Sequence, residues 1–194
     1  MAKVMLELAS RTEPGWSAYI LEHFDPFLVD HANAERKASA LALSFVARYA
    51  DRVEIIPALI ELAREELEHF HQVYQVMERR GLRLAPDTKD PYVNELNGLC
   101  RTGTRERFLD RFLVASIIES RGAERFRLIS EALEDAELKG FYRMLWASEA
   151  KHGNLFAQLA LTYFDPDELY PRLETLLAQE AEILAGLPWR PSLH

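Results

Sequence analysis

The sequence contains a single cysteine, Cys100, in 194 residues, which excludes an internal disulfide framework and is typical of a reducing compartment. It also lacks an apolar run of about 18 residues that could span a bilayer, and its N-terminus lacks the pattern of a signal peptide. We therefore expect a cytoplasmic protein with no membrane contact. The net charge of −8 excludes broad attraction to phosphate backbones, so any contact with nucleic acid needs a local basic patch.

Alternating patterns of the kind found in strands are scarce, whereas apolar residues at three- and four-residue spacing recur over long stretches. This predicts an all-α protein with a single domain over residues 1–194, because 48% hydrophobic residues in a chain of this length supply one sizeable core. Prolines, glycines and capping residues divide the chain into an irregular or partly helical arm and five long helices. The expected ranges are 1–24 for the arm and about 27–50, 54–80, 104–133, 135–164 and 165–187 for the helices.

The expected helix ends also predict how the helices are connected. Asp25, followed by Pro26, and Thr104 are expected to cap two helix starts, and Gly81 is expected to end the second long helix. Residues 81–103 form a long connection with one short helix near 92–99. A short link, a long crossover between helices two and three, and another short link are the connectivity of a ferritin-like four-helix bundle. The segment 165–187 is then an extra C-terminal helix.

A Glu-x-x-His pattern occurs twice, and each copy follows, by about thirty residues, a lone glutamate on the apolar face of an expected helix. The six residues are Glu35, Glu66, His69, Glu119, Glu149 and His152. This ligand order is typical of a carboxylate-bridged two-metal site in a helical bundle. Within each expected antiparallel pair, the midpoint between the two glutamates falls on the short link, so the two acids lie at the same depth.

Helical phase separates these residues from a competing pair, Glu68 and His71, which has the same spacing. The competing pair shares its face with charged and amide side chains, so we assign it to the solvated surface. A single glutamate in a helix usually lies on such a surface. Four carboxylates that are buried together require cations, and two divalent metal ions would balance their charge.

The ligand types also indicate the metal. Carboxylates and imidazoles without a thiolate suit iron or manganese better than structural zinc, whereas calcium and magnesium do not select histidine. Two iron ions that alternate between Fe2+ and Fe3+ are the first choice, and manganese is the second. By analogy with such bundles, each lone glutamate serves one ion together with the next Glu-x-x-His pair, and Glu66 and Glu149 act as bridges.

Four segments, DHANAERKAS, REELEHFHQVYQVMERRG, IIESRGAERF and SEAKHGNLF, contain these six residues and resemble the MiaE family. The resemblance covers roughly residues 20–190. It implies a bacterial di-iron monooxygenase that uses O2 to hydroxylate the isopentenyl group of a modified adenosine, often methylthiolated, beside the tRNA anticodon. The same six residues would then be the metal ligands, and the dimetal centre would be the catalytic group.

The resemblance also implies partners. The tRNA anticodon loop would be the substrate, and its candidate contacts are two arginine clusters that could instead cap helix ends: Arg101, Arg105, Arg107 and Arg111, and Arg79, Arg80 and Arg83. The sequence has no GxGxxG fingerprint for a flavin or nicotinamide, so electrons would come from outside, from a ferredoxin and its reductase. The oligomeric state is not indicated.

Three alternative functions and the role of one neighbouring residue remain open. A ferroxidase or iron-storage bundle would use the same six ligands, and so would a peroxide-consuming bundle of the rubrerythrin or manganese-catalase kind. A bundle that binds zinc without catalysis is the weakest alternative. His31, one turn before Glu35, could donate a hydrogen bond to a ligand or be an ordinary core histidine.

Overall fold

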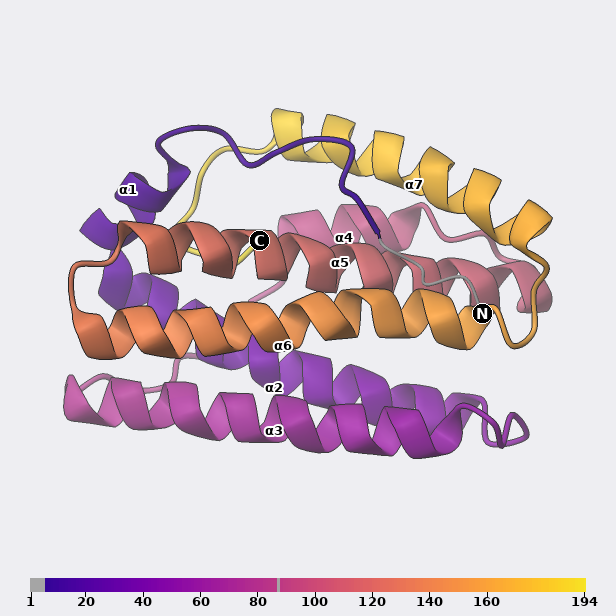
Figure 1. The fold of residues 1–194 in the computed structure, drawn as a ribbon, viewed down its shortest axis with the longest axis horizontal. Coiled ribbons are helices and arrows are strands. Elements are labelled where there is room, and N and C mark those ends of the chain that lie inside the picture. The colour runs from indigo at the N-terminus through magenta and orange to yellow at the C-terminus, as the bar shows by residue number, and fades with distance from the viewer. Residues whose placement is uncertain (1–5, 87) are drawn as a thin grey trace. The chain divides into compact units, whose positions relative to one another are not determined.

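A computed structural model describes residues 6–86 and 88–194, so the first five residues of the expected arm lie outside the described residues. Within this part of the chain there are seven helices and no strand, which confirms the all-α prediction (Figure 1). The helices are α1 (Trp16–Glu22), α2 (Phe24–Arg48), α3 (Ile56–Arg79), α4 (Pro91–Gly98), α5 (Thr104–Ala132), α6 (Ala136–Ala160) and α7 (Pro166–Gly186). None of the described helices has the length and apolar character needed to cross a membrane.

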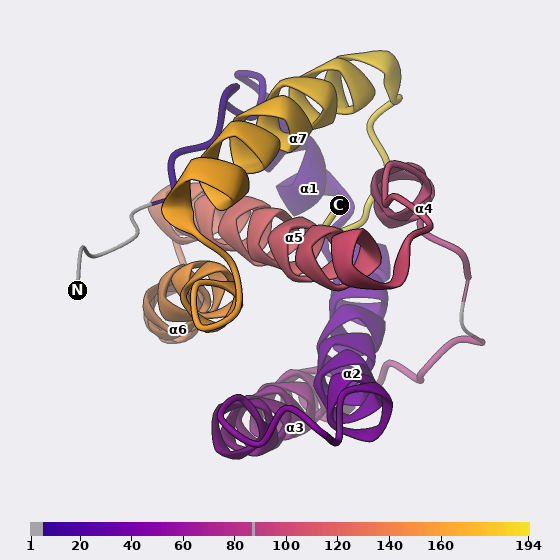
Figure 2. The same ribbon diagram turned by 90° about the vertical axis from the view of Figure 1, so that its right-hand side faces the viewer.

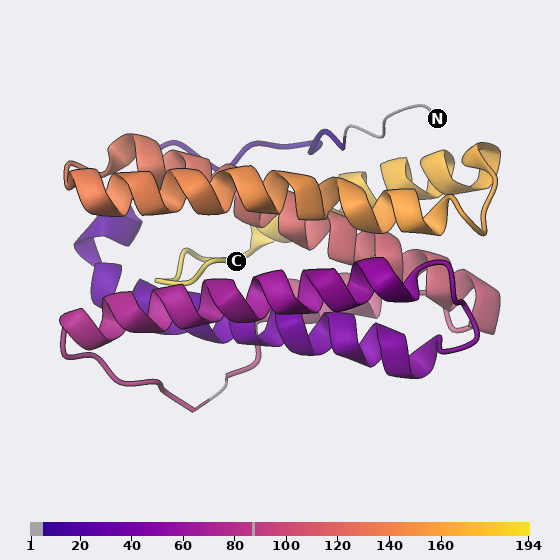
Figure 3. The ribbon, with the colours of Figure 1, turned by 60° about the horizontal axis from the view of Figure 1, so that its bottom comes forward.

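The chain divides into two compact units. The α2–α3 unit comprises Tyr19–Thr88 and Arg190–Leu193, and the α4–α7 unit comprises the described residues up to Ala18, Lys89–Trp189 and His194. Each unit contains one antiparallel helical hairpin, α2 with α3 and α5 with α6 (Figure 3). The expected order of a short link, a long crossover that contains one short helix, another short link and an extra C-terminal helix is confirmed.

The second helix of the α2–α3 unit ends where the sequence predicts. Gly81 has a φ of 70°, a left-handed conformation that only glycine adopts without strain. Its backbone N–H donates to the carbonyl of Glu78 at 3.0 Å, and the N–H of Leu82 donates to that of Met77 at 2.9 Å. This is a Schellman cap, which satisfies carbonyl groups that the end of a helix leaves without partners.

The predicted start of α2 is wrong. The helix begins at Phe24 with His23 in the capping position, so Asp25 lies in the first turn and does not cap it. Pro26 is tolerated at the third helical position because the first four N–H groups of a helix have no acceptor within it. Asp25 still favours this helix end, since a carboxylate in the first turn interacts favourably with the helix dipole.

In the α4–α7 unit, the α5–α6 link is three residues long, Leu133–Asp135. Asp135 caps α6 by accepting a hydrogen bond from the Leu138 N–H at 2.8 Å. The predicted cap at Thr104 is one residue late, because Gly103 occupies the capping position and Thr104 is the first residue of α5. The short helix expected in the crossover is α4, and its cap Asp90 accepts from the Tyr92 N–H at 2.9 Å.

The extra helix, α7, packs against α4 and α5 within the same unit (Figure 2). Its buried stripe consists of Leu169, Leu173, Leu176 and Leu177, followed by the buried carboxylate of Glu180. Aromatic side chains fill the interior of the unit, and Phe112 of α5 meets Phe156 of α6 edge-on with their ring centroids 5.8 Å apart. The two helices pack closely against each other, so the packing determines where their polar residues lie.

Candidate metal centre

In the α2–α3 unit, three of the six predicted ligands lie together. Glu35 of α2 and Glu66 and His69 of α3 are all buried, and each offers a ligand atom within 4.8 Å of the others. The Nδ1 atom of His69 is 3.4 Å from Glu66 Oε2 and 3.6 Å from Glu35 Oε2. Both carboxylates therefore face the same imidazole nitrogen, and we call these three residues the α2–α3 half-site.

His31 contacts this half-site directly. It is fully buried, and its Nε2 atom lies 2.7 Å from Glu35 Oε1. With Glu35 ionised, its carboxylate can only accept, so Nε2 of His31 is the donor of this bond. The second oxygen of Glu35 stays on the side of His69, so the hydrogen bond orients the carboxylate as expected of a residue that supports a metal ligand.

In the α4–α7 unit, the other three predicted ligands also lie together. Glu149 and His152 of α6 are buried and Glu119 of α5 is partly exposed, and the three offer ligand atoms within 4.8 Å of one another. His152 Nδ1 lies 3.1 Å from Glu149 Oε2. These residues are the α5–α6 half-site, and it repeats the ligand types and the spacing of the first half-site.

The competing pair is on the surface, as helical phase predicts. The side chains of Glu68 and His71 are 59% and 60% exposed. They share the spacing of a Glu-x-x-His pattern, but they lie on the outer face of α3. Spacing alone therefore does not separate the buried Glu-x-x-His pairs from the exposed one, whereas the apolar stripe does.

The donor set of each half-site suits a divalent transition metal. Each half-site combines two carboxylates with one imidazole, and one divalent ion would balance the charge of the two carboxylates. Burial of two ionised carboxylates side by side is costly without such a cation. With no thiolate among the donors, iron and manganese fit the set, and Nδ1 is the histidine atom turned toward the carboxylates in both half-sites.

Several of the arginines suggested for tRNA contact form internal ion pairs. Arg101 binds the fully buried Asp110 through Nε and Nη2 at 2.9 and 2.8 Å. Arg105 forms a two-bond pair with Glu168 of α7, with Nη2 at 2.7 Å from Oε2. Arg80 of the other cluster pairs with Asp25 at 2.7 Å. These three guanidinium groups therefore hold parts of each unit together.

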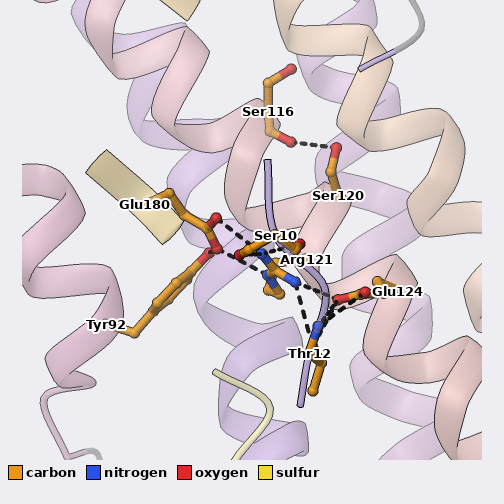
Figure 4. Close-up of polar contacts among 8 residues, drawn as sticks. All are labelled: Ser10, Thr12, Tyr92, Ser116, Ser120, Arg121, Glu124 and Glu180. Atoms are coloured by element: carbon orange, nitrogen blue, oxygen red, sulfur yellow. Dashed lines mark hydrogen bonds and ion pairs between the residues drawn. The ribbon is translucent and has the colours of Figure 1, made fainter. Parts of the chain in front are cut away.

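The structure also contains a buried polar cluster that was not predicted (Figure 4). At its centre, the fully buried Arg121 of α5 binds Glu180 of α7 through Nε at 2.9 Å and Nη2 at 3.0 Å. Arg121 also donates to the Ser10 carbonyl at 3.0 Å, and Tyr92 donates to Glu180 at 2.9 Å. The only signal in the sequence is a charged residue within an otherwise leucine-rich helical stripe, at Glu180.

The fold and the two half-sites place the protein in the ferritin-like class of all-α proteins that bind metals through carboxylates and histidines. A model of the family described as tRNA-(MS[2]IO[6]A)-hydroxylase (MiaE) matches residues 2–194, and the chain belongs to this family. The resemblance seen in the sequence is thereby confirmed.

Two curated relatives bear the name tRNA 2-(methylsulfanyl)-N(6)-isopentenyladenosine(37) hydroxylase. The protein from Pseudomonas putida is 36% identical over 177 residues, which cover 91% of this chain and 86% of the relative. The protein from Salmonella typhimurium is 33% identical over 107 residues, or 55% of this chain and 39% of the relative.

A solved structure supports the same fold class. It is described as protein 43 with aldehyde deformylating oxygenase activity from Synechococcus, and it is 38% identical to this chain with a TM-score of 0.91. The likeness covers 96% of this chain and 94% of the solved one. The likeness therefore extends over the segments that carry both half-sites.

Proposed function

We propose that this protein is a tRNA-modifying di-iron monooxygenase, which uses O2 to hydroxylate the isopentenyl group of an isopentenyl-adenosine, with or without the methylthio group, beside the anticodon. The observation that carries the proposal is the family match over residues 2–194, together with the name of the Pseudomonas putida relative. The two half-sites support it, because they supply the carboxylates and imidazoles that such chemistry requires. A tRNA substrate and the single cysteine favour the cytoplasm as the location.

We further propose that residues 1–194 act as one domain in which the two half-sites serve a single centre of two iron ions. Glu35, Glu66 and His69 would hold one ion and Glu119, Glu149 and His152 the other, with Glu66 and Glu149 as bridging carboxylates. Four carboxylates balance the charge of two divalent ions, which supports a count of two. We expect purified protein loaded with Fe2+ to bind two ions per chain, and one ion or none would contradict the proposal.

The iron would supply the activation of O2 that the hydroxylation of an allylic C–H bond requires. The reaction balances as R–H + O2 + 2 e− + 2 H+ → R–OH + H2O, so two electrons must enter in each turnover. The proposed source is an external ferredoxin and its reductase, because the sequence has no flavin or nicotinamide fingerprint. Within the protein, His31 holds Glu35 in one orientation, and burial keeps bulk water away from every proposed ligand except the partly exposed Glu119.

The substrate base must leave the stack of the anticodon loop before its prenyl group can reach a buried centre, and single-stranded loops allow this at low cost. The arginine clusters remain the proposed source of phosphate contacts. Arg83 and Arg107 are exposed and suit this role best, since Arg80, Arg101 and Arg105 are engaged in ion pairs within the protein.

Mass spectrometry of tRNA nucleosides from cells with and without this protein tests the proposal. We expect the hydroxylated isopentenyl-adenosine to disappear when the gene is deleted and to return with the wild-type protein. A variant with Glu119→Ala and Glu149→Ala should fail to restore it. A hydroxylated pool that is unchanged by the deletion would overturn the proposed substrate.

The Synechococcus structure favours one second candidate, an oxygenase that removes the formyl group from an aldehyde. Both candidates use the same class of metal centre, so the substrate separates them. Iron-loaded protein supplied with O2 and electrons should hydroxylate prenylated tRNA and release no formate from aldehydes. Release of formate from aldehydes, with no hydroxylation of the prenylated tRNA, would favour the second candidate instead.

A further inference from the structure

Each helical hairpin contains a buried serine whose hydroxyl contacts the backbone of the neighbouring helix. In the α2–α3 unit, Ser39 Oγ donates to the carbonyl of Ala63 at 2.8 Å. In the α4–α7 unit, Ser116 Oγ donates to the carbonyl of Gly153 and accepts from the N–H of Ala157 at 3.2 Å. Both serines are among the buried polar residues, and we call these two contacts the serine latches.

Both latches lie within about one helical turn of the proposed ligands. Ser39 follows Glu35 by four residues, and its acceptor Ala63 precedes Glu66 by three. Ser116 precedes Glu119 by three residues, and its acceptor Gly153 directly follows His152. Each latch therefore joins the helix with the lone glutamate to the helix with the Glu-x-x-His pattern at the depth of the half-site.

The latches add directional contacts to interfaces that are otherwise largely apolar. Apolar packing is nondirectional, and a slip of one helix by a single residue would move a ligand by about 1.5 Å along the axis. Metal coordination tolerates deviations of only about 0.2 Å. A hydroxyl that must stay within about 3.0 Å of one carbonyl oxygen limits such slippage.

Gly153 allows the latch on α5 and α6 to form. A Cβ atom at this position would meet the Ser120 hydroxyl and would lie 3.2 Å from the backbone nitrogen and 3.3 Å from the Cα of Ser120. The two helices therefore approach closely beside His152. Ser120 also contacts the residue that forms this latch, because its hydroxyl donates to the Ser116 carbonyl at 2.8 Å (Figure 4).

Two other serines on the same helices show that burial or helix position alone does not produce a latch. Ser130 of α5 is buried, but its hydroxyl donates at 2.8 Å to Arg127 in its own helix. Ser44 of α2 donates at 2.7 Å to Leu41, also in its own helix. These two residues are matched controls, because the hydroxyl of each donates within its own helix.

We propose that Ser39 and Ser116 are positioning residues for the metal centre. Each one fixes the axial register of its hairpin, so that the lone glutamate and the Glu-x-x-His pair can bind the same ion. This inference rests on the proposed function, since it requires that the half-sites bind metal. It assigns to the two serines a role beyond the six ligands and His31.

Titration of the metal-free full-length protein with Co2+ tests this inference, with binding followed by calorimetry and by the visible ligand-field bands of the bound ion. We expect Ser116→Ala to weaken one of two binding events by about tenfold, the lower end for residues that support ligands, and to shift its bands. Ser39→Ala should weaken the other event, and Ser39→Thr, which keeps the hydroxyl, should bind as the wild type does. Ser130→Ala and Ser44→Ala should leave both events unchanged.

Wild-type affinities and bands in folded Ser116→Ala and Ser39→Ala would overturn the positioning role and leave the proposed function intact. Equal weakening in the Ser130→Ala and Ser44→Ala controls would also overturn it, because the effect would then be one of general stability. Fewer than two Co2+ ions bound by the wild type would instead contradict the proposed dimetal centre. If Ser116→Ala does not fold, Ser39→Ala decides the outcome, because Ser39 is less enclosed.

Discussion

Arg121 and Glu180 form a fully buried, two-bond ion pair between α5 and α7. Burial opposes a charged guanidinium, yet the hydrogen bonds and charge of Glu180 raise the pKa of Arg121 above its ordinary value. The carboxylate also accepts from Tyr92, and burial, followed by the charge of Glu180, raises the pKa of that phenol. The arginine is thus held charged and the tyrosine neutral in the same interior cluster.

Glu180→Gln should be destabilising, because it removes the fully buried counter-ion of Arg121 and leaves Glu124 as its remaining carboxylate partner. The expected loss in the free energy of unfolding is about 1–3 kcal/mol, the cost of depriving buried donors of an acceptor, and urea denaturation measures it. A double variant, Arg121→Met with Glu180→Leu, should recover only part of this loss: it removes both charges of the pair, but Glu124 loses Arg121 and the Tyr92 hydroxyl loses its acceptor. Arg127→Ala is the control and should cost no more than about 1 kcal/mol, because the Arg127–Glu131 pair is exposed.

A loss in Glu180→Gln no larger than in Arg127→Ala would show that the buried pair contributes little to the fold. A double variant as unstable as the single one would show that packing around the pair matters more than its charge.

Another buried carboxylate, Asp110, should make stability depend on pH. Burial by itself raises the pKa of Asp110, but hydrogen bonds from Arg101 and Arg172 outweigh it and hold the pKa below its ordinary value. The contribution of this carboxylate is therefore complete above the unfolded-state pKa, about 3.9, and is lost as the pH falls through the lower folded-state pKa. Asp110→Asn should lower the free energy of unfolding at pH 7, by a margin that shrinks toward pH 3.

Urea denaturation at several pH values between 7 and 3 measures that margin. Asp25→Asn is the matched control, because its pair with Arg80 is exposed, and it should change stability by less than about 1 kcal/mol throughout. A margin for Asp110→Asn that stays constant down to pH 3 would contradict the assignment.

Two glycines of α6 should respond to alanine in opposite directions. Gly153→Ala forces α5 and α6 apart, because the new Cβ would meet the backbone of Ser120 at 3.2 and 3.3 Å, and overpacking of this kind costs about 1–3 kcal/mol. At Gly140, by contrast, nothing lies within 4 Å of a Cβ, so Gly140→Ala should stabilise the helix by about 0.5–1 kcal/mol. Thermal denaturation followed by circular dichroism compares the two, and a Gly153→Ala as stable as Gly140→Ala would refute the close approach.

Removal of the His31 hydrogen bond should weaken metal binding without unfolding the protein. His31→Phe keeps a ring in contact with Phe27, whose ring centroid is 5.7 Å away, but it loses the donor to Glu35. We expect the affinity of one of the two ions to fall by about 10- to 100-fold, measured by competition with a chelator. His71→Phe, on the exposed face of α3, should bind both ions as the wild type does, and equal affinities in both variants would contradict the supporting role of His31.

The grouping of the candidate ligands in each half-site could be predicted because their pattern is local. Glu66 and His69 interrupt an apolar stripe at helical spacing, and burial on that face follows from the period of the helix. Gly81 could be predicted for a similar reason, since a left-handed cap favours glycine. The start of α2 could not, because both Asp25 and His23 can occupy the turn before a helix and tertiary contacts decide between them.

The serine latches and the Arg121–Glu180 pair could not be predicted, for a different reason. Ser39 and Ser116 bond to backbone carbonyls, and a backbone acceptor leaves no mark on the sequence. Arg121 and Glu180 lie 59 residues apart, on helices whose relative position depends on the packing of the whole unit. The periodicity of apolar residues shows which side of a helix is buried, but it does not show which residue of another helix a buried side chain contacts.

Within six residues, α5 presents three polar side chains to three different partners. Ser116 contacts α6, Glu119 belongs to the α5–α6 half-site, and Arg121 binds α7 and the chain near Ser10. A residue inserted or deleted between Ser116 and Arg121 would turn one end of this stretch by about 100° relative to the other. The spacing between Ser116 and Arg121 is therefore fixed even where individual residues can be substituted. We expect insertions and deletions in natural variants to occur elsewhere in the chain.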